Sequence, residues 1–166
     1  IVAGKCDIVD CLPENGTAFL NWDSTFVKTR NLKTITIKYG TNSECDILAE
    51  NIKSEKDFIS FDVKTKAGES EQIKANLLGA QNVQNLLGAI ACSLELGMNL
   101  GEVKNACQKI SQDLGAMQLQ KTNSGLKIIK SSYTANYHGV ITALDYLKIW
   151  SGKKAIIMPS FIEIVK

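Results

Sequence analysis

Four carboxamide side chains stand close together in one short segment, and they are well suited to recognising a ligand. The segment reads Gly79-Ala80-Gln81-Asn82-Val83-Gln84-Asn85. Asn82 and Asn85 are three positions apart, so on a helix they project from the same side. A carboxamide offers a donor and an acceptor together, which suits the edge of a purine ring and equally suits free backbone groups at a helix start. The residues alone therefore leave a nucleotide-base site and simple helix capping both open.

A second polar group follows a predicted strand and precedes a predicted helix. It is the run Ser131-Ser132-Tyr133-Thr134-Ala135-Asn136. Open α/β sheets bind ligands beyond the carboxyl ends of their strands, so the position favours a binding site. By itself the run does not identify a ligand.

Several common chemistries are excluded by the residues that are missing. His138 is the single histidine, so no Ser-His-Asp site can form, and it is interpreted as a solvated loop residue. Gly4-Lys5 lacks the upstream glycine of a phosphate-binding loop and is followed by Cys6 where Ser or Thr is required. The five cysteines are scattered without a C-x-x-C pair, which predicts reduced core residues and not metal ligands.

Composition indicates a globular protein. The 166 residues are 45% apolar, enough for a core of one domain or one and a half. The formal charge of +2, without long runs of one sign, gives no reason to expect nucleic acid as a partner. No apolar stretch approaches the roughly 18 to 20 residues that cross a bilayer, and the first residues do not form a signal peptide. We therefore expect a cytoplasmic protein without a transmembrane segment.

The first half of the chain predicts an α/β arrangement. A helical pattern over residues 2–12 ends in a Pro-Glu-Asn-Gly turn, and a buried strand is expected at 17–21. Asp23 is expected to cap a short helix through Phe26 and Val27. From 34 to 78 apolar and polar residues alternate, which predicts three or four antiparallel strands.

The second half returns to the helical period and then restarts as strands. A helix over 79–97 carries the carboxamides, and another begins near Leu100. A hairpin over 117–129, a helix from about Gly139 and a strand at 155–158 follow. The expected fold class is α/β: a mixed sheet with antiparallel strands and flanking helices over 1–112, then the start of a Rossmann-like domain over 113–166. Because the pattern begins and ends inside domains, we expect a fragment.

Three segments, in this order, resemble the signature motifs of the Mur ligase family. The central domain of that family carries K-x-E-I, then L-P-x-x-G-x-A-x-x-N-x-D-D, then G-x-H-N-x-x-N-x-x-A-A. Its C-terminal domain opens with G-R-x-x, followed by D-D-S-Y-x-A-N-P and A-L-x-x-L. The similar segments here are residues 5–8, 12–24, 79–89, 115–118, 130–137 and 143–147. They resemble most the members that join D-alanyl-D-alanine to a UDP-linked muramoyl tripeptide.

The resemblance implies an ATP-dependent amide ligase of peptidoglycan precursor synthesis. In such a reaction a peptide carboxylate takes the γ-phosphate of ATP, and an amine attacks the acyl phosphate through a tetrahedral intermediate, while Mg²⁺ neutralises the phosphate oxygens. The implied cofactors are ATP and Mg²⁺, and the implied partners are a UDP-linked muramoyl peptide and D-alanyl-D-alanine. Residues 1–112 would be the later part of the ATP-binding central domain.

The resemblance also implies a set of nucleotide-binding residues. The adenine would lie near Asn82 and Asn85, the ribose at Ser131, and the cleft between domains would be lined by Tyr133 and Asn136. The complete implied set is Gln81, Asn82, Asn85, Asn21, Asp23, Ser131, Tyr133 and Asn136. No catalytic residue and no metal ligand is implied within this chain, because the family's phosphate loop and metal ligands precede the matching region.

The chain departs from the family's motifs at three places. Gln81 replaces a histidine, Ala116 an arginine, and Lys130-Ser131 an aspartate pair. Losing one charge-assisted hydrogen bond costs about 1.5 to 3 kcal/mol, or more than tenfold in affinity, so an altered nucleotide site is expected. The 166 residues alone are expected to be inactive. The alternatives are a degenerate relative that binds a nucleotide or protein without ligation, and a ligase acting on folate or a poly-amino acid.

Overall fold

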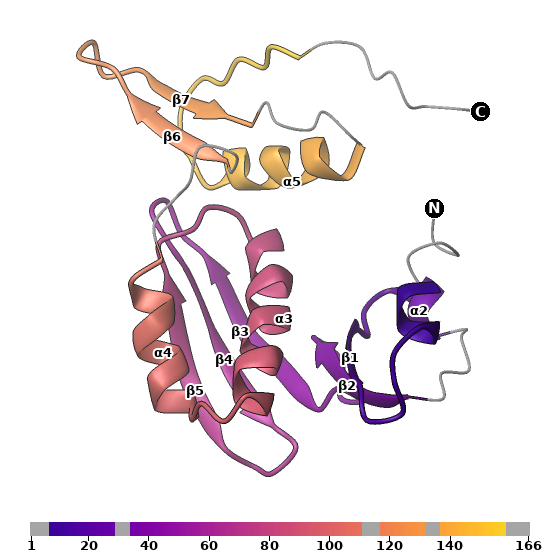
Figure 1. Cartoon of the computed structure of the whole chain (residues 1–166). Coiled ribbons are helices and arrows are strands. Elements are labelled where there is room, and N and C mark those ends of the chain that lie inside the picture. Colours follow the sequence, from indigo (N-terminus) through magenta and orange to yellow (C-terminus); the bar gives the residue numbers. More distant parts are fainter. Residues whose placement is uncertain (1–6, 29–33, 111–116, 132–136, 159–166) are drawn as a thin grey trace.

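A five-stranded sheet covered on one face by two helices forms the larger part of the molecule, and a hairpin with one helix forms the smaller part (Figure 1). This is seen in a computed structural model that describes residues 7–28, 34–110, 117–131 and 137–158. Residues 7–10 are helical, in agreement with the helix predicted there. The remainder of that predicted helix's amino-terminal part, residues 2–6, lies outside the described residues.

The strands follow each other across the sheet in the order of the sequence. They are β1 (Thr17–Asn21), β2 (Ile35–Gly40), β3 (Ile47–Ser54), β4 (Ile59–Thr65) and β5 (Ser70–Ala75). β1 and β2 are parallel, with Thr17 opposite Ile35, and β3 to β5 are antiparallel. β2 also pairs in parallel with β3, through Tyr39 and Gly40 only. The prediction that every strand from residue 34 is antiparallel is therefore wrong for β2, because alternation shows which face is buried and not strand direction.

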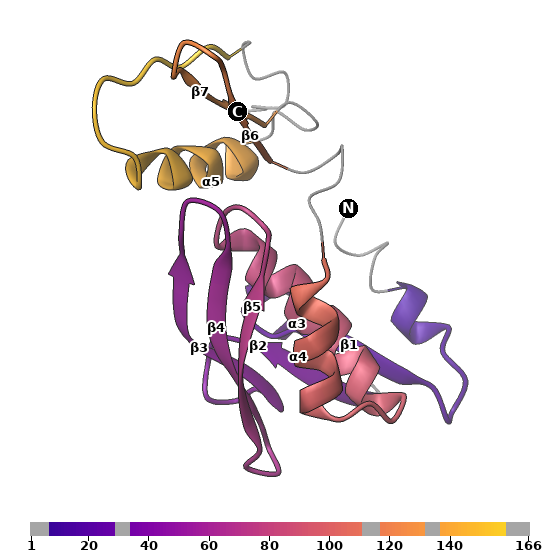
Figure 2. The same ribbon diagram turned by 90° about the vertical axis from the view of Figure 1, so that its left-hand side faces the viewer.

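Two helices cover the same face of β3, β4 and β5 (Figure 2). α3 (Gln81–Glu95) and α4 (Leu100–Gln108) confirm the two helices predicted in this region. α4 starts with a capping box, in which Asn99 accepts from the Glu102 amide and the Glu102 carboxylate accepts from the Asn99 amide. A shorter helix, α2 (Thr25–Lys28), follows β1.

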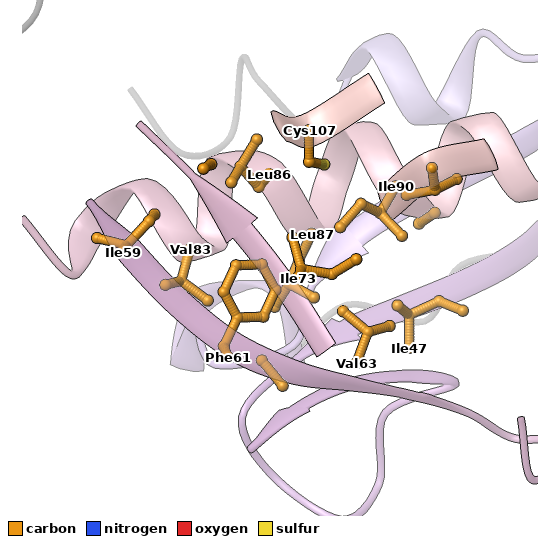
Figure 3. Packing of buried hydrophobic residues seen from close by; sticks show 14 of the residues in the cluster. Ile47, Ile59, Phe61, Val63, Ile73, Val83, Leu86, Leu87, Ile90 and Cys107 are labelled. Carbon is orange, nitrogen blue, oxygen red and sulfur yellow. The ribbon is translucent and has the colours of Figure 1, made fainter. Parts of the chain in front are cut away.

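The main core lies between these two helices and the sheet (Figure 3). Its most enclosed side chains, each 0% exposed, are Ile59, Val63, Ile73 and Leu87. Burying one such side chain contributes about 1.5 to 3 kcal/mol. The core therefore fixes α3, and with it the carboxamide segment, against the sheet.

The smaller part contains β6 (Gln118–Lys121), β7 (Lys127–Lys130) and α5 (Tyr137–Lys148). β6 and β7 form the predicted hairpin, and α5 is the predicted helix. The strand predicted at 155–158 is wrong: these residues have no strand pairing, and Ile157 is 100% exposed. A run of β-branched residues becomes a strand only where a neighbour completes its hydrogen bonds. The predicted domain boundary at 112/113 lies outside the described residues and stays a prediction.

The cysteines within the described ranges are all free thiols. Cys107 is buried, Cys45 and Cys92 are partly exposed, and Cys11 is exposed. Core placement was therefore a correct prediction for Cys107 and a wrong one for Cys11. In the part of the chain that the structure describes, no helix has the length and apolar character needed to cross a membrane.

Candidate functional site

The candidate site begins at the turn that leads from β5 into α3. Gly79 has φ of +87°, a left-handed conformation that glycine adopts without strain. The Gln81 side chain folds back over Gly79, and a Cβ built on Gly79 would overlap the Gln81 carboxamide. Glycine is therefore required here twice, for the direction of the turn and for the position of Gln81.

Two hydrogen bonds link Leu78, Asn82 and Asn85 in series. Asn82 Nδ2 donates to the Leu78 carbonyl oxygen at 2.8 Å, and Asn85 Nδ2 donates to Asn82 Oδ1 at 3.3 Å. The prediction that Asn82 and Asn85 share one side of the helix agrees with this contact. Asn85 is exposed, and its carboxamide has hydrogen-bonding groups beyond the one used here. It can therefore offer both a donor and an acceptor to a ligand.

Helix capping accounts for only part of this arrangement. Ala80 is the N-cap residue and makes no side-chain cap bond. Gln81 Nε2 reaches the same Leu78 carbonyl oxygen as Asn82, at 3.4 Å. Two carboxamides thus serve a carbonyl that precedes the helix, and they do not cap its free amides.

One acceptor at the site has no partner. Gln81 Oε1 is buried and makes no hydrogen bond with the described residues. A buried acceptor without a partner costs about 1 to 3 kcal/mol. A ligand that brings an N–H group, as an exocyclic amine does, would satisfy this oxygen.

Asp23 links β1 to the loop that follows β2. Its carboxylate accepts from the Thr41 amide at 3.0 Å, from Thr41 Oγ1 at 3.1 Å and from Asn42 Nδ2 at 3.0 Å. Gly40 makes this approach possible, because a Cβ there would lie 2.7 Å from Asp23 Oδ1. The prediction that Asp23 caps the short helix is wrong, because these donors engage its carboxylate on the side of the β2 loop.

Asn21 and Asp23 also contact α3 through one residue, Gln84. Asn21 Nδ2 donates to Gln84 Oε1 at 3.1 Å, and Gln84 Nε2 donates to Asp23 Oδ2 at 3.3 Å. The end of β1 is thereby joined to the helix turn that carries the carboxamides. Gln84 was missed as a site residue, although its place in the carboxamide-rich segment was a signal for it.

An aromatic and charged group lies beside Asp23. Trp22 Nε1 donates to Glu44 Oε2 at 2.7 Å, and Lys38 Nζ is 4.1 Å from the centroid of the Trp22 ring. Lys28 Nζ is 3.8 Å from Glu44 Oε2. The Trp22 hydrogen bond, with the Lys28 charge, lowers the pKa of Glu44. Nothing in the sequence pattern indicated this group, because its members are distant along the chain.

The predicted residues in the second polar run are described only in part. Ser131 is exposed and directly follows β7. Tyr133 and Asn136, together with Ala116, lie outside the described residues. Their nucleotide-binding roles, like that of Ser131, stay predictions.

No metal site is found in the ranges that the structure describes: they contain no group of three or more His, Cys, Asp or Glu residues able to hold an ion.

Comparison with known families defines the class of this α/β protein. The family model described as Mur ligase middle domain matches residues 1–93, which is more than half of the 166 residues. The chain therefore belongs to the Mur ligase family, as its motifs suggested.

Solved structures of this class are similar over most of the chain. MurF from Acinetobacter baumannii has a TM-score of 0.80 at 21% identity, over 90% of this chain and 33% of that one. MurF ligase from Thermotoga maritima in complex with ADP has a TM-score of 0.75 at 14% identity, over 90% of this chain and 34% of that one. These matches confirm the expected α/β fold.

Curated relatives are enzymes named as muramoyl ligases. The UDP-N-acetylmuramoyl-tripeptide--D-alanyl-D-alanine ligase of Haemophilus influenzae is 28% identical over 150 residues, 89% of this chain and 32% of the relative. The UDP-N-acetylmuramate--L-alanine ligase of Endomicrobium trichonymphae is 27% identical over 154 residues, 90% of this chain and 34% of the relative. The chain thus spans about a third of the length of these relatives.

Proposed function

We propose that this chain is the part of an ATP-dependent amide ligase of peptidoglycan precursor synthesis that recognises the base of the nucleotide. The enzyme would work in the cytoplasm and join D-alanyl-D-alanine to a UDP-linked muramoyl peptide. Family membership supports the class of reaction. The choice of amine is supported by four relatives named as D-alanyl-D-alanine ligases, each similar over 89% or more of this chain.

The carboxamide turn is the observation that carries the proposal. Asn85 presents an exposed donor and acceptor, and Gln81 Oε1 is a buried acceptor without a partner. An adenine ring offers the complementary set, an exocyclic amine beside ring nitrogens. The turn lies at the position where the resemblance implies the adenine.

The other residues of the proposal hold this turn in place or extend the site. Asn21 and Asp23 bond to Gln84 and so keep the first turns of α3 against the end of β1. They are therefore positioning residues in this proposal, although the resemblance implied direct binding. Ser131 would contact the ribose, and Tyr133 and Asn136 would line the cleft between a central domain over 1–112 and a C-terminal domain over 113–166.

ATP, when bound, supplies the phosphate that activates the peptide carboxylate as an acyl phosphate, and Mg²⁺ offsets the charge of the phosphate oxygens. We assign the main Mg²⁺ ligands and the phosphate loop to residues other than these 166, because this sequence contains no G-x-x-x-x-G-K-[ST] motif. These 166 residues alone would then release no phosphate from ATP.

A nucleotide-binding relative without ligase activity is the second candidate. It is favoured by Gln81, Lys130 and Ser131, which stand where the family's motifs have a histidine and two aspartates. An intact phosphate loop in the gene upstream of Ile1, and ligation by the complete gene product, would favour the enzyme.

Titration of fluorescently labelled ATP into the chain tests the base site. Asn85→Ala should weaken binding about twofold to tenfold, the worth of one neutral hydrogen bond. Ser93→Ala is the matched control, since Ser93 lies on the same helix and donates to the Ala89 carbonyl at 2.9 Å. Equal affinity of the wild type and Asn85→Ala would contradict the base site, and phosphate release from ATP by the purified chain would contradict its inactivity.

A further inference from the structure

A second, smaller apolar cluster joins the two parts of the molecule. Its buried members are Leu78, from the turn before α3, and Met117, Tyr146 and Trp150, from the smaller part. Leu78 is 1% exposed, although it comes from the segment that leads into the candidate site. This cluster, Leu78, Met117, Tyr146 and Trp150, is called the joining cluster below.

Polar contacts hold the joining cluster to the turn between β3 and β4. The Tyr146 hydroxyl donates to the Lys56 carbonyl oxygen at 2.6 Å. Lys56 Nζ lies 5.3 Å from the centroid of the Trp150 ring, and the Tyr146 and Trp150 rings meet edge to face at 6.3 Å. Figures 1 and 2 both show this turn reaching towards α5. Tyr146 thus connects α5 to the larger part by a bond distant from the carboxamides.

Leu78 takes part in both places. Its side chain is buried in the joining cluster, and its carbonyl oxygen accepts from Asn82 Nδ2. Asn82 Oδ1 in turn accepts from Asn85 Nδ2. An unbroken series of contacts therefore runs from the joining cluster through Leu78 and Asn82 to the exposed Asn85.

We propose that Leu78 is a positioning residue that makes nucleotide affinity depend on the contact between α5 and the β3–β4 turn. The joining cluster fixes Leu78, the Leu78 carbonyl orients the Asn82 carboxamide, and Asn82 orients Asn85 for the base. A carboxamide held in its binding orientation before the ligand arrives loses less conformational freedom on binding. The proposal rests on the proposed function, because it assigns Asn85 to base recognition.

Coupling between two places must act in both directions. A looser joining cluster should weaken nucleotide binding, and a bound nucleotide should tighten the joining cluster. The second effect distinguishes coupling from a merely structural role of Tyr146, since a structural residue would not respond to the ligand.

The test uses Tyr146→Phe, which removes the hydroxyl and keeps the aromatic packing. Labelled ATP should bind it about twofold to fivefold more weakly than the wild type, part of the worth of one hydrogen bond. Asp145→Asn is the matched control on α5: Asp145 pairs with Lys148 on the same helix, and affinity should not change. Equal affinity of Tyr146→Phe and the wild type would overturn the proposal.

Acrylamide quenching of Trp150 fluorescence, in a Trp22→Phe background, gives the reciprocal measurement. ATP should reduce the quenching, and no ATP-dependent change in a chain that binds ATP would overturn the coupling. If the chain binds no ATP, the proposed base site fails, and the series of contacts is still tested without ligand. Asn82→Ala should then raise the quenching of Trp150 and Ser93→Ala should not; equal quenching in both would overturn the proposal.

Discussion

Glu44 accepts a hydrogen bond from the Trp22 indole and lies beside the Lys28 ammonium, and both contacts favour its charged form. Its pKa is therefore below the ordinary 4.5. A carboxyl group with a lowered pKa contributes stability that is present above the ordinary pKa and is lost as the pH falls through the lowered value. The Trp22 contact should accordingly persist under mildly acidic conditions.

Fluorescence of Trp22 in a Trp150→Phe background measures this titration. We expect a transition with its midpoint below pH 4.5, as protonation of Glu44 weakens the indole hydrogen bond. Glu44→Gln should abolish the transition, and Glu95→Gln, at the far end of α3, should leave it unchanged. A midpoint at or above 4.5 would contradict the assignment.

At the scale of single residues, short sequence distances were interpreted correctly and long ones were not. Asn82 and Asn85 are three apart, and helix geometry alone places them together. Asp23 bonds to Thr41 across 18 residues and to Gln84 across 61, which no local pattern encodes. A local rule suggested a helix cap for Asp23, whereas its carboxylate accepts from donors brought by tertiary contacts.

At the scale of elements, Asp23 joins β1, the loop after β2 and α3. Asp23→Ala removes the acceptor for the Thr41 amide and for the Asn42 and Gln84 carboxamides. We expect the free energy of unfolding in urea to fall by about 1 to 3 kcal/mol, because hydrogen bonds to a charged group are involved and the site is partly solvated. Hydrogen exchange at the Thr41 amide should become faster.

The control for Asp23 is Asp145→Ala, whose carboxylate pairs with Lys148 on the surface of α5. Exposed pairs of this kind contribute about 0 to 1 kcal/mol. A loss for Asp23→Ala no greater than that of the control would show that the Asp23 bonds do not hold these elements together.

The helices and the number of strands could be predicted because hydrophobic period is a local property. α3 buries Val83, Leu86, Leu87 and Ile90 on one face, as the pattern required. Strand direction depends on the partner, and so β2 was assigned wrongly. The apolar run at 155–158 has the composition of a strand, but no paired neighbour in the described part of the chain gives it that structure.

At the scale of the whole molecule, the two apolar clusters differ greatly in size. The main core takes side chains from β3, β4, β5, α3 and α4, whereas the joining cluster has four buried members. The smaller part of the molecule should therefore lose its structure first, because less apolar burial opposes its conformational entropy.

Single-tryptophan variants separate the two clusters. Trp150 reports on the joining cluster in Trp22→Phe, and Trp22 reports on the end of β1 in Trp150→Phe. We expect the Trp150 signal to change at a lower urea concentration than the Trp22 signal, with far-UV circular dichroism following Trp22. Coincident transitions would show instead that the two clusters unfold as one cooperative unit.

Leu78 contributes its side chain to one contact and its carbonyl to another, and this dual use has an evolutionary consequence. Substitutions at positions 82 and 146 are distant in sequence, yet both act on the same residue. Neither position should be free to drift independently of the other. In lineages that lose the aromatic hydroxyl at 146, we expect compensating changes at 78 or 82, so that the three positions vary together over descent.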